Sequence, residues 1–541
     1  MSSAATRLLA RRWALPDVAT PVVDRFFDAW ASGHTSIDLT SDEVAVLAAC
    51  PAVSDGHRQA PLVLQQHRLQ SWRLAKAEGC VAARLRELVT AGQDTDAIDL
   101  EEMDALFPGA DSAQRRAAIV GVQREFALVT GGPGTGKTTV AARLLVLLAN
   151  REPNLRMALA APTGKAARRL GEAIGKAVSG LDKRFADVVS RLEVAARDTR
   201  TLHRLLGWNR VTGHCRFYTG NPLPYDVIVV DEASMLDLML WDRLLAAVAA
   251  GTRLVILGDH RQLESVQPGR VLGELVMAAD EGLLNGTHVE LNLNYRFDAD
   301  ADIGRLAGAV RNHDGDAALQ VLTDAKRTGV AVRYTSGALD DAVAEIWPRV
   351  SAVVQSTTPE MALKALSRVR VLCALNRGPY GAAGMNARIE NRLQQDGVGI
   401  GPKTHGRPVI VTVNDPQHSG LVNGDVGVVL HKIGGYDTGV YFQIPGTGQT
   451  RRVSVEAMPR HETAWALTVH RSQGSEFETV LLVLPPTTHE LVTSELVYTG
   501  VTRARSKVLV AADAKVIRAA CAWREPRRTG LFEKIRSVMT G

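Results

Sequence analysis

The sequence predicts an α/β protein with two parallel-sheet domains, a helical N-terminal domain and a small inserted β-barrel. From residue 126 onwards, short apolar runs alternate with helical patterns, which is typical of parallel sheets covered on both faces. Before residue 109, apolar residues recur at helical spacing and no catalytic pattern occurs. Residues 401–459 instead contain four short β-rich runs separated by Gly, Asn, Asp and Pro, which indicates an antiparallel barrel.

The length and composition allow several soluble domains. The chain has 541 residues, enough for two to four domains, and its 46% hydrophobic and 22% charged residues are ordinary for a globular protein. The net charge of +5 is compatible with a basic groove but does not by itself indicate nucleic-acid binding. The five scattered cysteines lack metal-ligand spacing, and no apolar run is long enough to span a bilayer. We therefore expect free thiols and a cytoplasmic location.

The domain boundaries are predicted from these changes of pattern. We expect the helical N-terminal domain at residues 1–108, the first parallel-sheet domain at 109–344 and the second at 345–541. In the first of these two sheet domains, residues 207–226 place Val-Thr-Gly-His between two short runs, which predicts a short β-hairpin. In the second, residues 401–459 form the inserted barrel.

A complete phosphate-binding loop follows the first apolar strand. Residues Gly131 to Thr138 fit G-x-x-x-x-G-K-[ST], in which glycines let backbone N–H groups wrap phosphate at a helix N-terminus. Lys137 would reach the β- and γ-phosphates, and the Thr138 hydroxyl would hold Mg²⁺. A Gly-rich turn with a chance lysine is the alternative, which the preceding strand and following helix disfavour. The sequence therefore predicts a site for ATP and Mg²⁺, whose loop comprises Gly131, Gly132, Pro133, Gly134, Thr135, Gly136, Lys137, Thr138 and Thr139.

An acidic pair closes the apolar run from Val227 to Val230. Asp231 can bind Mg²⁺, while Glu232 can orient and deprotonate an attacking water. Such a pair at a strand end is as often a solvated loop, but its position behind a phosphate loop favours the catalytic interpretation. Glu232 also favours a hydrolase over a P-loop kinase, which has no water to activate.

Seven ordered segments then indicate a family. They are APTGKAARRL (161–170), TLHRLLG (201–207), VVDEASMLDL (229–238), LGDHRQLESVQPG (257–269), LNLNYRF (291–297), TVHRSQGSEFETV (468–480) and YTGVTRARSKV (498–508). In this order they resemble the motifs of the RecD-like branch of superfamily-one DNA helicases. The resemblance implies two RecA-like P-loop ATPase domains and a helicase that moves 5′→3′ along DNA, a direction that no residue here establishes by itself.

The resemblance also implies roles for individual residues. Gln114 would read adenine, Gln262 would sense the γ-phosphate, and Arg296 and Arg503 correspond to two arginine fingers, whose rigid charged forks stabilise transition-state charge. The expected catalytic residues are Lys137, Asp231, Glu232, Gln262, Arg296 and Arg503. The residues expected near the DNA strand are Thr163, Lys165, His203, Thr468, His470 and Ser472. Their side chains suit phosphate contacts, although each alone is also compatible with a structural role such as a helix cap.

Two N-terminal segments, residues 33–39 and 61–85, resemble the domain with which complex-bound RecD-like proteins dock on a RecC-type subunit. The resemblance therefore implies RecB-type and RecC-type partners, the 5′-ended single strand at a duplex end as substrate, and a role in recombinational DNA repair. We find no carboxylate cluster followed by Glu-x-Lys, so nuclease activity is expected in a partner subunit. A free-standing helicase and an ATP-dependent regulatory subunit with little unwinding remain alternatives, although intact Glu232, Arg296 and Arg503 argue against the second.

Overall fold

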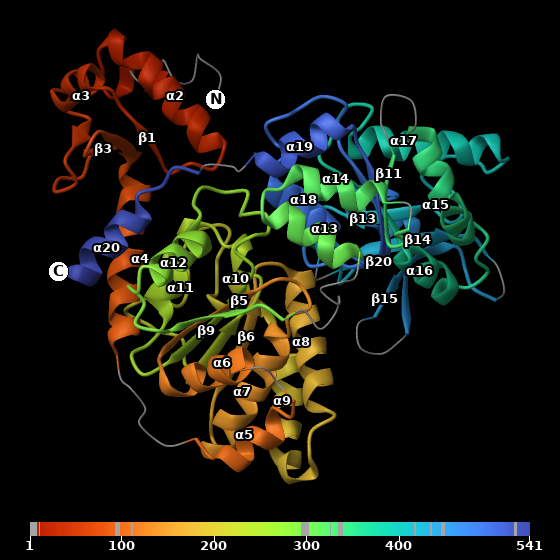
Figure 1. Cartoon of the computed structure of the whole chain (residues 1–541), viewed down its shortest axis with the longest axis horizontal. Helices are drawn as coiled ribbons and strands as arrows, with labels where there is room; N and C mark the ends of the chain where they lie inside the picture. Colours follow the sequence, from red (N-terminus) through yellow and green to blue (C-terminus); the bar gives the residue numbers. More distant parts are fainter. Residues whose placement is uncertain are drawn as a thin grey trace.

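Three bodies make up the chain in this computed structural model: an N-terminal module (residues 8–71), a first parallel-sheet domain and a second one (Figure 1). The structure describes residues 8–541 apart from 10, 92–97, 110–111, 294–301, 325, 334–338, 416–417, 433–434, 445–448 and 524–526. All five cysteines are free, as expected. Among the described residues, no helix is both long and apolar enough to cross a membrane.

Mostly buried apolar strands form the first parallel sheet. Its strands run in the order β10-β5-β9-β8-β6-β7, and neighbouring strands are parallel throughout. They are β5 (Phe126–Gly131), β6 (Met157–Ala161), β7 (Arg200–Thr201), β8 (Val227–Val230), β9 (Arg253–Gly258) and β10 (His288–Leu291). Because side chains alternate along a strand, Phe126 and Leu128 join one core while Ala127 and Val129 join the core on the opposite face.

Helices cover both faces of this sheet. One core contains α5 (Leu100–Leu106), α6 (Ser112–Gln123), α7 (Lys137–Arg151), α8 (Gly164–Val178) and α9 (Ala186–Arg197). The other contains α4 (Trp72–Thr90), α10 (Leu202–Leu205), α11 (Leu238–Ala247), α12 (Val271–Asp280) and α20 (Leu531–Thr540). The first domain therefore uses helices from near both ends of the chain.

The second sheet is also parallel, in the order β11-β20-β19-β12-β18. Its strands are β11 (Val330–Arg333), β12 (Val369–Cys373), β18 (Ala466–Thr468), β19 (Phe477–Val483) and β20 (Ala504–Ala511). One core contains α13 (Asp302–Arg311), α14 (Gly315–Thr323), α18 (Ser494–Val501) and α19 (Ala514–Ala522). The opposite core contains α15 (Leu339–Val354), α16 (Pro359–Ser367) and α17 (Ala382–Gln395).

The second domain does not follow the predicted range 345–541. It already includes α13, α14 and β11, because β11 pairs with β20 and the two helices pack in the same core as α18 and α19. It ends before α20, which packs on α4 and α12 of the first domain (Figure 1). These contacts join segments far apart in the chain, so no local pattern could place the boundary.

The inserted segment forms a five-stranded antiparallel sheet in the order β16-β15-β14-β13-β17. Its strands are β13 (Pro408–Val411), β14 (Val426–Leu430), β15 (Gly439–Gln443), β16 (Thr450–Val453) and β17 (His461–Thr463). The four predicted runs correspond to the first four strands, whereas β17 was missed. No pairing joins the outer strands β16 and β17 among the described residues, so the predicted barrel closure is not confirmed.

The N-terminal region is not purely helical, which corrects the prediction. Besides α2 (Thr20–Ala31) and α3 (Ser41–Ala48), it contains a sheet in the order β1-β4-β3-β2. These strands, β1 (Ser36–Asp38), β2 (Val53–Ser54), β3 (Leu62–Gln65) and β4 (Arg68–Ser71), have two to four residues each. Strands of this length are too short to show an alternating pattern.

The β-hairpin predicted at residues 207–226 is likewise absent from the structure, which describes this whole stretch. The chain turns back where the Asn209 N–H donates to the His214 carbonyl oxygen at 2.9 Å, and one isolated bridge pairs Tyr218 with Asn221. Three glycines and two prolines disfavour a ladder here, because glycine adds no side-chain packing and proline donates no hydrogen bond.

A buried carboxylate joins the C-terminal helix to the N-terminal module. Glu78 on α4 is fully buried and accepts hydrogen bonds from the Thr35 hydroxyl (2.6 Å), the Gln70 amide (2.8 Å) and the Gly530 N–H (3.0 Å). The Lys534 ammonium of α20 lies 2.7 Å from the same carboxylate and supplies the opposite charge. Buried charges require such pairing, so this cluster fixes α20 against the first domain.

We predict that Lys534→Ala destabilises the protein by about 3 kcal/mol, because it leaves the Glu78 carboxylate buried without its cation. The measurement is urea unfolding followed by circular dichroism. The matched control on the same helix is Arg536→Ala, whose partner Glu281 and own side chain are about half exposed, so its loss should cost less than about 1 kcal/mol. Equal midpoints for the two variants would contradict this role of Glu78.

Candidate active site

The phosphate loop connects β5 to α7, as the sequence predicts. Gly134 (φ 86°) and Gly136 (φ 88°) adopt the left-handed backbone conformation that glycine reaches without strain. Gly136 caps the N-terminus of α7, which favours bound anions. The Lys137 ammonium folds over the loop and donates to the carbonyl oxygens of Gly131 (2.6 Å) and Gly132 (2.9 Å). The lysine charge therefore lies at the loop on which phosphate would bind.

Gln114 lies beside this loop. It is buried on α6, and its amide donates to the carbonyl oxygen of Thr135 at 3.2 Å. The Thr135 hydroxyl in turn donates to the carbonyl oxygen of Gly132 at 2.9 Å. Gln114, the predicted adenine contact, is thus hydrogen-bonded directly to the phosphate loop. In this position Gln114 and the loop can contact the same nucleotide.

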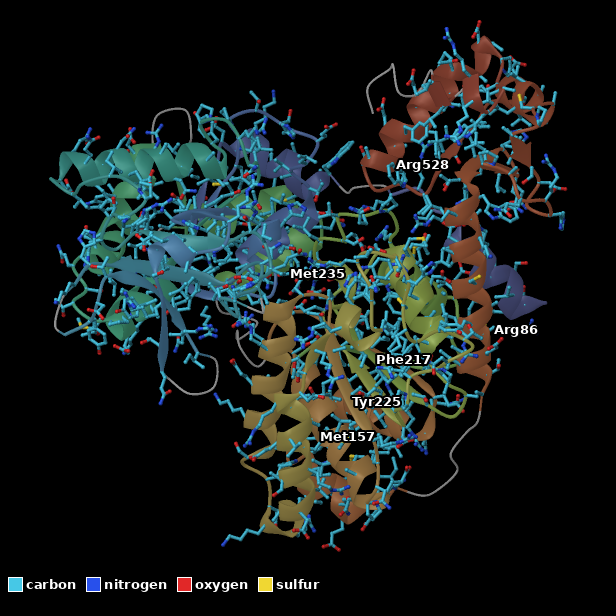
Figure 2. The ribbon with its side chains drawn as sticks, turned by 180° about the vertical axis from the view of Figure 1, so that it is seen from behind. Arg86, Met157, Phe217, Tyr225, Met235 and Arg528 are labelled. Carbon is cyan, nitrogen blue, oxygen red and sulfur yellow. The ribbon has the colours of Figure 1, made fainter. Side chains whose placement is uncertain are left out.

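A cleft of about 840 Å³ lies between the two parallel-sheet domains, at the carboxyl ends of the strands. Figure 2 labels Met235, three residues after the acidic pair, on the side of the first domain that faces the second. The first domain lines the cleft with Gln114, Pro133, Gly134, Gly136, Lys137, Thr138, Thr139, Asp231, Glu232 and Gln262. The second contributes Gly474, Glu476, Arg503 and Arg505. The cleft therefore brings together most of the predicted nucleotide-site residues.

The acidic pair follows β8 directly. The Asp231 carboxylate accepts the Glu232 N–H at 2.8 Å. Burial, together with the adjacent Glu232 carboxylate, raises the pKa of Asp231 to about 6, while the Lys137 ammonium opposes this shift. Asp231 and the hydroxyl of Thr138 offer the oxygen ligands that Mg²⁺ prefers. Glu232 itself has left-handed backbone angles (φ 55°, ψ 42°), which are uncommon outside glycine and cluster at functional sites.

One arginine crosses the cleft. The Arg503 guanidinium of the second domain donates to the Gln262 side-chain oxygen at 2.9 Å, and the Gln262 amide donates to the Asp259 carboxylate at 3.1 Å. Burial lowers the pKa of Arg503, and the nearby Glu232 carboxylate opposes that shift. Two of the predicted catalytic residues, far apart in sequence, therefore touch each other. Arg296, the other predicted finger, lies outside the described residues.

The hydroxyl residues predicted to contact DNA have local structural roles here. The Thr163 hydroxyl caps α8 by accepting the Ala166 N–H at 3.2 Å. Thr468 ends β18 and lies half-buried. Ser472 is fully buried and donates to the carbonyl oxygen of Val469 at 2.7 Å. In this arrangement the Ser472 hydroxyl is buried and bonded within its own turn, so a contact between Ser472 and DNA stays a prediction.

The cationic and imidazole residues differ in exposure. Lys165 is half-buried and donates to the Ser475 hydroxyl of the second domain at 2.5 Å. Burial and the neighbouring Arg370 guanidinium lower the pKa of Lys165 to about 7. His203 is exposed on α10, with its ring edge-on to Trp208 at 6.1 Å between centroids. His470 is half-buried in the turn that follows β18.

Sequence reasoning did not single out Arg169, Glu476 and Arg505, which line the cleft, or Tyr498, which lies beside the phosphate loop. Glu476 lies 3.6 Å from Arg169 of the first domain and 3.0 Å from Arg505 of its own domain. Tyr498 approaches the phosphate loop so closely that a methyl group on Gly132 would lie 2.8 Å from its hydroxyl. All four fall inside the quoted motif segments, but a linear motif does not show which of its side chains face the cleft.

Two family models and several curated relatives match this chain. The AAA domain family model matches residues 114–268, and the UvrD-like helicase C-terminal domain model matches residues 463–511. The RecBCD enzyme subunit RecD of Mycobacterium tuberculosis is 37% identical, over 96% of this chain and 89% of the relative. The ATP-dependent RecD2 DNA helicase of Deinococcus radiodurans is 30% identical, over 92% of this chain and 61% of the relative.

Among solved structures, the Pif1 helicase from Candida albicans covers 79% of this chain and 99% of its own, with 17% identity and a TM-score of 0.41. The relationship to RecD is much stronger, because identity above 30% extends along almost the whole chain. The phosphate loop, the acidic pair and the cross-cleft arginine all lie within that matched length. The chain therefore belongs to the RecD family of RecBCD enzyme subunits.

Proposed function

We propose that this chain is the ATP-driven helicase subunit of a RecBCD-type complex that processes broken DNA ends for recombinational repair. It would move 5′→3′ on the 5′-ended single strand of a duplex end, beside RecB-type and RecC-type partners in the cytoplasm. One observation carries the motor assignment: Lys137, Asp231 and Glu232 of one domain share a cleft with Arg503 of the other. The complex assignment is supported by identity to the Mycobacterium tuberculosis RecD subunit along the chain.

The cleft residues suit ATP hydrolysis. The Lys137 ammonium would balance charge on the β- and γ-phosphates, and Gln114 would contact adenine. Thr138 and Asp231 would hold Mg²⁺, which neutralises phosphate charge when bound. Glu232 would accept a proton from the attacking water. Gln262 and Arg503 would contact the γ-phosphate, and Arg296 remains a proposed second finger.

Because Arg503 belongs to the second domain, its contact with the phosphates would depend on how closely the two domains approach. Hydrolysis would then change the relative position of the domains, and repeated cycles would advance the strand. Thr163, Lys165, His203, Thr468 and His470 remain proposed phosphate contacts along that path. Contacts of this kind position the strand without reading its sequence.

Two alternatives remain. A free-standing helicase is favoured by the 30% identity to the Deinococcus radiodurans RecD2 helicase, and size-exclusion chromatography with an unwinding assay on the purified chain separates it from a subunit. A regulatory subunit with little unwinding would not need Glu232 and Arg503 in one cleft. DNA-stimulated ATP hydrolysis by the purified chain separates that alternative from a motor.

We predict that Glu232→Gln lowers the rate of ATP hydrolysis by about a hundredfold or more while ATP binding remains, because the amide cannot accept the proton of water. Binding of a fluorescent ATP analogue and steady-state hydrolysis would be measured on the same preparation. The control is Glu281→Gln, a change at a half-exposed carboxylate of the surface, which should leave both unchanged. Loss of binding together with turnover would make Glu232 structural.

We predict that Arg503→Ala lowers ATP hydrolysis by about a thousandfold, the lower end of the effect of an arginine finger. Arg503→Lys should not restore the rate, because an ammonium cannot reproduce the planar fork that contacts Gln262 and would also contact phosphate. The control is Arg518→Ala in α19 of the same domain, where the side chain is 56% exposed. A lysine variant with wild-type turnover would remove Arg503 from the catalytic residues.

We predict that partner docking depends on the exposed apolar surface of the N-terminal module. Val18 is 66% exposed, and Trp30, 41% exposed, lines an apolar groove together with Trp13 and Phe27. Contiguous exposed apolar surface marks protein interfaces. The double variant Val18→Asp, Trp30→Ala should lose co-purification with RecB-type and RecC-type subunits and retain ATP hydrolysis. The control is Val194→Asp on α9, where valine is 65% exposed. Unchanged co-purification of the double variant would place the interface elsewhere.

A further inference from the structure

The segment from Asp259 to Arg270, which we call the sensor loop, runs from the ATP cleft to a contact with the N-terminal module. It begins at the end of β9 and carries Gln262 into the cleft. The second domain holds its first half through the backbone of Leu263, whose N–H donates to the Thr499 hydroxyl at 3.0 Å. The carbonyl oxygen of the same residue accepts the Gln473 amide at 3.1 Å.

The C-terminal segment holds the second half of the sensor loop. One nitrogen of the Arg527 guanidinium donates to the carbonyl oxygens of Ser265 (2.7 Å), Gly269 (3.0 Å) and Gln267 (3.3 Å). The Ser265 hydroxyl donates to the Gln267 carbonyl oxygen at 2.8 Å and tightens the same turn. Arginine suits this position because its rigid, permanently charged fork can serve several acceptors at once.

The N-terminal module contacts both the sensor loop and Arg527. The Gly33 carbonyl oxygen accepts the Gly269 N–H at 3.0 Å. A methyl group on Gly33 would lie 2.7 Å from the central carbon of the Arg527 guanidinium, so no other residue fits while that group stays in place. The adjacent Arg528 N–H donates to the His34 ring at 3.0 Å, and Figure 2 labels Arg528 beside the module.

We propose that Arg527 is a positioning residue for ATP hydrolysis, which sets the sensor loop so that Gln262 stands at the γ-phosphate. The N-terminal module then acts on the ATP site through Gly33 and Arg527, so that a partner docked on the module would alter turnover. This inference rests on the role of Gln262 in the proposed function.

The electrostatics of the loop support a strong effect of Arg527. Glu264 lies in the same loop, only 11% exposed, with its carboxylate 3.3 Å from Arg270. Burial raises the pKa of Glu264 to about 7, and the guanidinium groups of Arg270 and Arg527 oppose this shift. Removing Arg527 takes the donor from three carbonyl oxygens and a cation from this carboxyl. The second half of the sensor loop, which begins at Ser265, three residues after Gln262, then loses the contacts that hold its conformation.

The test is DNA-stimulated ATP hydrolysis by the full chain carrying Gly33→Ala or Arg527→Ala. Each should lower kcat roughly three- to tenfold, in the range of coupling effects transmitted through a packed network. The KM for ATP and the melting temperature should stay close to wild type. The matched control is Gly251→Ala, since Gly251 also has a positive φ (80°) but has no atom within 4 Å of a methyl group there. It should retain wild-type kcat.

The double variant Gly33→Ala, Arg527→Ala tests whether Gly33 acts on the ATP site through Arg527. Because the methyl group at residue 33 acts by displacing the guanidinium, Gly33→Ala should have no further effect on kcat when Arg527 is already alanine. Arg527→Lys keeps the charge without the planar fork and should give a kcat between those of wild type and Arg527→Ala. If Arg527→Ala does not fold, Arg527→Lys replaces it in the double variant.

Three outcomes would overturn the inference. The losses of kcat in Gly33→Ala and Arg527→Ala could multiply in the double variant, or all variants could keep the wild-type kcat. The third outcome is a loss of kcat in Gly251→Ala as large as that in Gly33→Ala. A wild-type chain without ATP hydrolysis would instead overturn the proposed function, and this inference with it.

Discussion

The hydrogen bond between Arg503 and Gln262 is the contact on which the ATP cleft depends. Burying a guanidinium costs several kcal/mol unless its donors are satisfied. Arg503 meets this requirement with the Gln262 side chain (2.9 Å) and the carbonyl oxygens of Thr499 (3.2 Å) and Ser475 (3.3 Å). Only one of these acceptors belongs to the first domain, so the position of the arginine depends on how the domains meet. The geometry of the ATP cleft therefore depends on the relative arrangement of the two domains.

A second set of contacts joins the C-terminal segment to the N-terminal module and the first domain. The segment after α19 leaves the second domain, passes the N-terminal module and ends as α20 on the first domain. Arg527 and Lys534 hold it at two points, one on the sensor loop and one on the buried Glu78. Since both points also contact the N-terminal module, the module is joined to the two ATPase domains through the C-terminal segment rather than by α4 alone.

The two proposals made above would give the N-terminal module two roles. Its exposed apolar residues suit a protein partner, whereas its contact with the sensor loop reaches the ATP cleft through Gly33. A docking module with no path to the site would only recruit the motor. Under the inference above, a module that touches the loop carrying Gln262 would also set the rate of ATP hydrolysis.

The part of the site chemistry that depends on the local order of residues could be predicted before the chain was seen folded. The phosphate loop, the acidic pair and their flanking strands are written in consecutive residues, and the structure places them as expected at the carboxyl ends of one parallel sheet. The family resemblance supplied Gln114, Gln262 and Arg503, which also lie in the cleft. The four main strands of the inserted sheet were predictable for the same local reason.

Features that depend on residues far apart in the chain became visible only in the folded protein. Tertiary packing buried Ser472, paired strands of two to four residues in the N-terminal module and moved the start of the second domain to α13. Arg527 shows the reason most clearly: its acceptors lie more than 250 residues earlier, and no local pattern specifies that contact. Periodicity and motifs report neighbours along the chain, whereas burial and long-range hydrogen bonds exist only once the chain has packed.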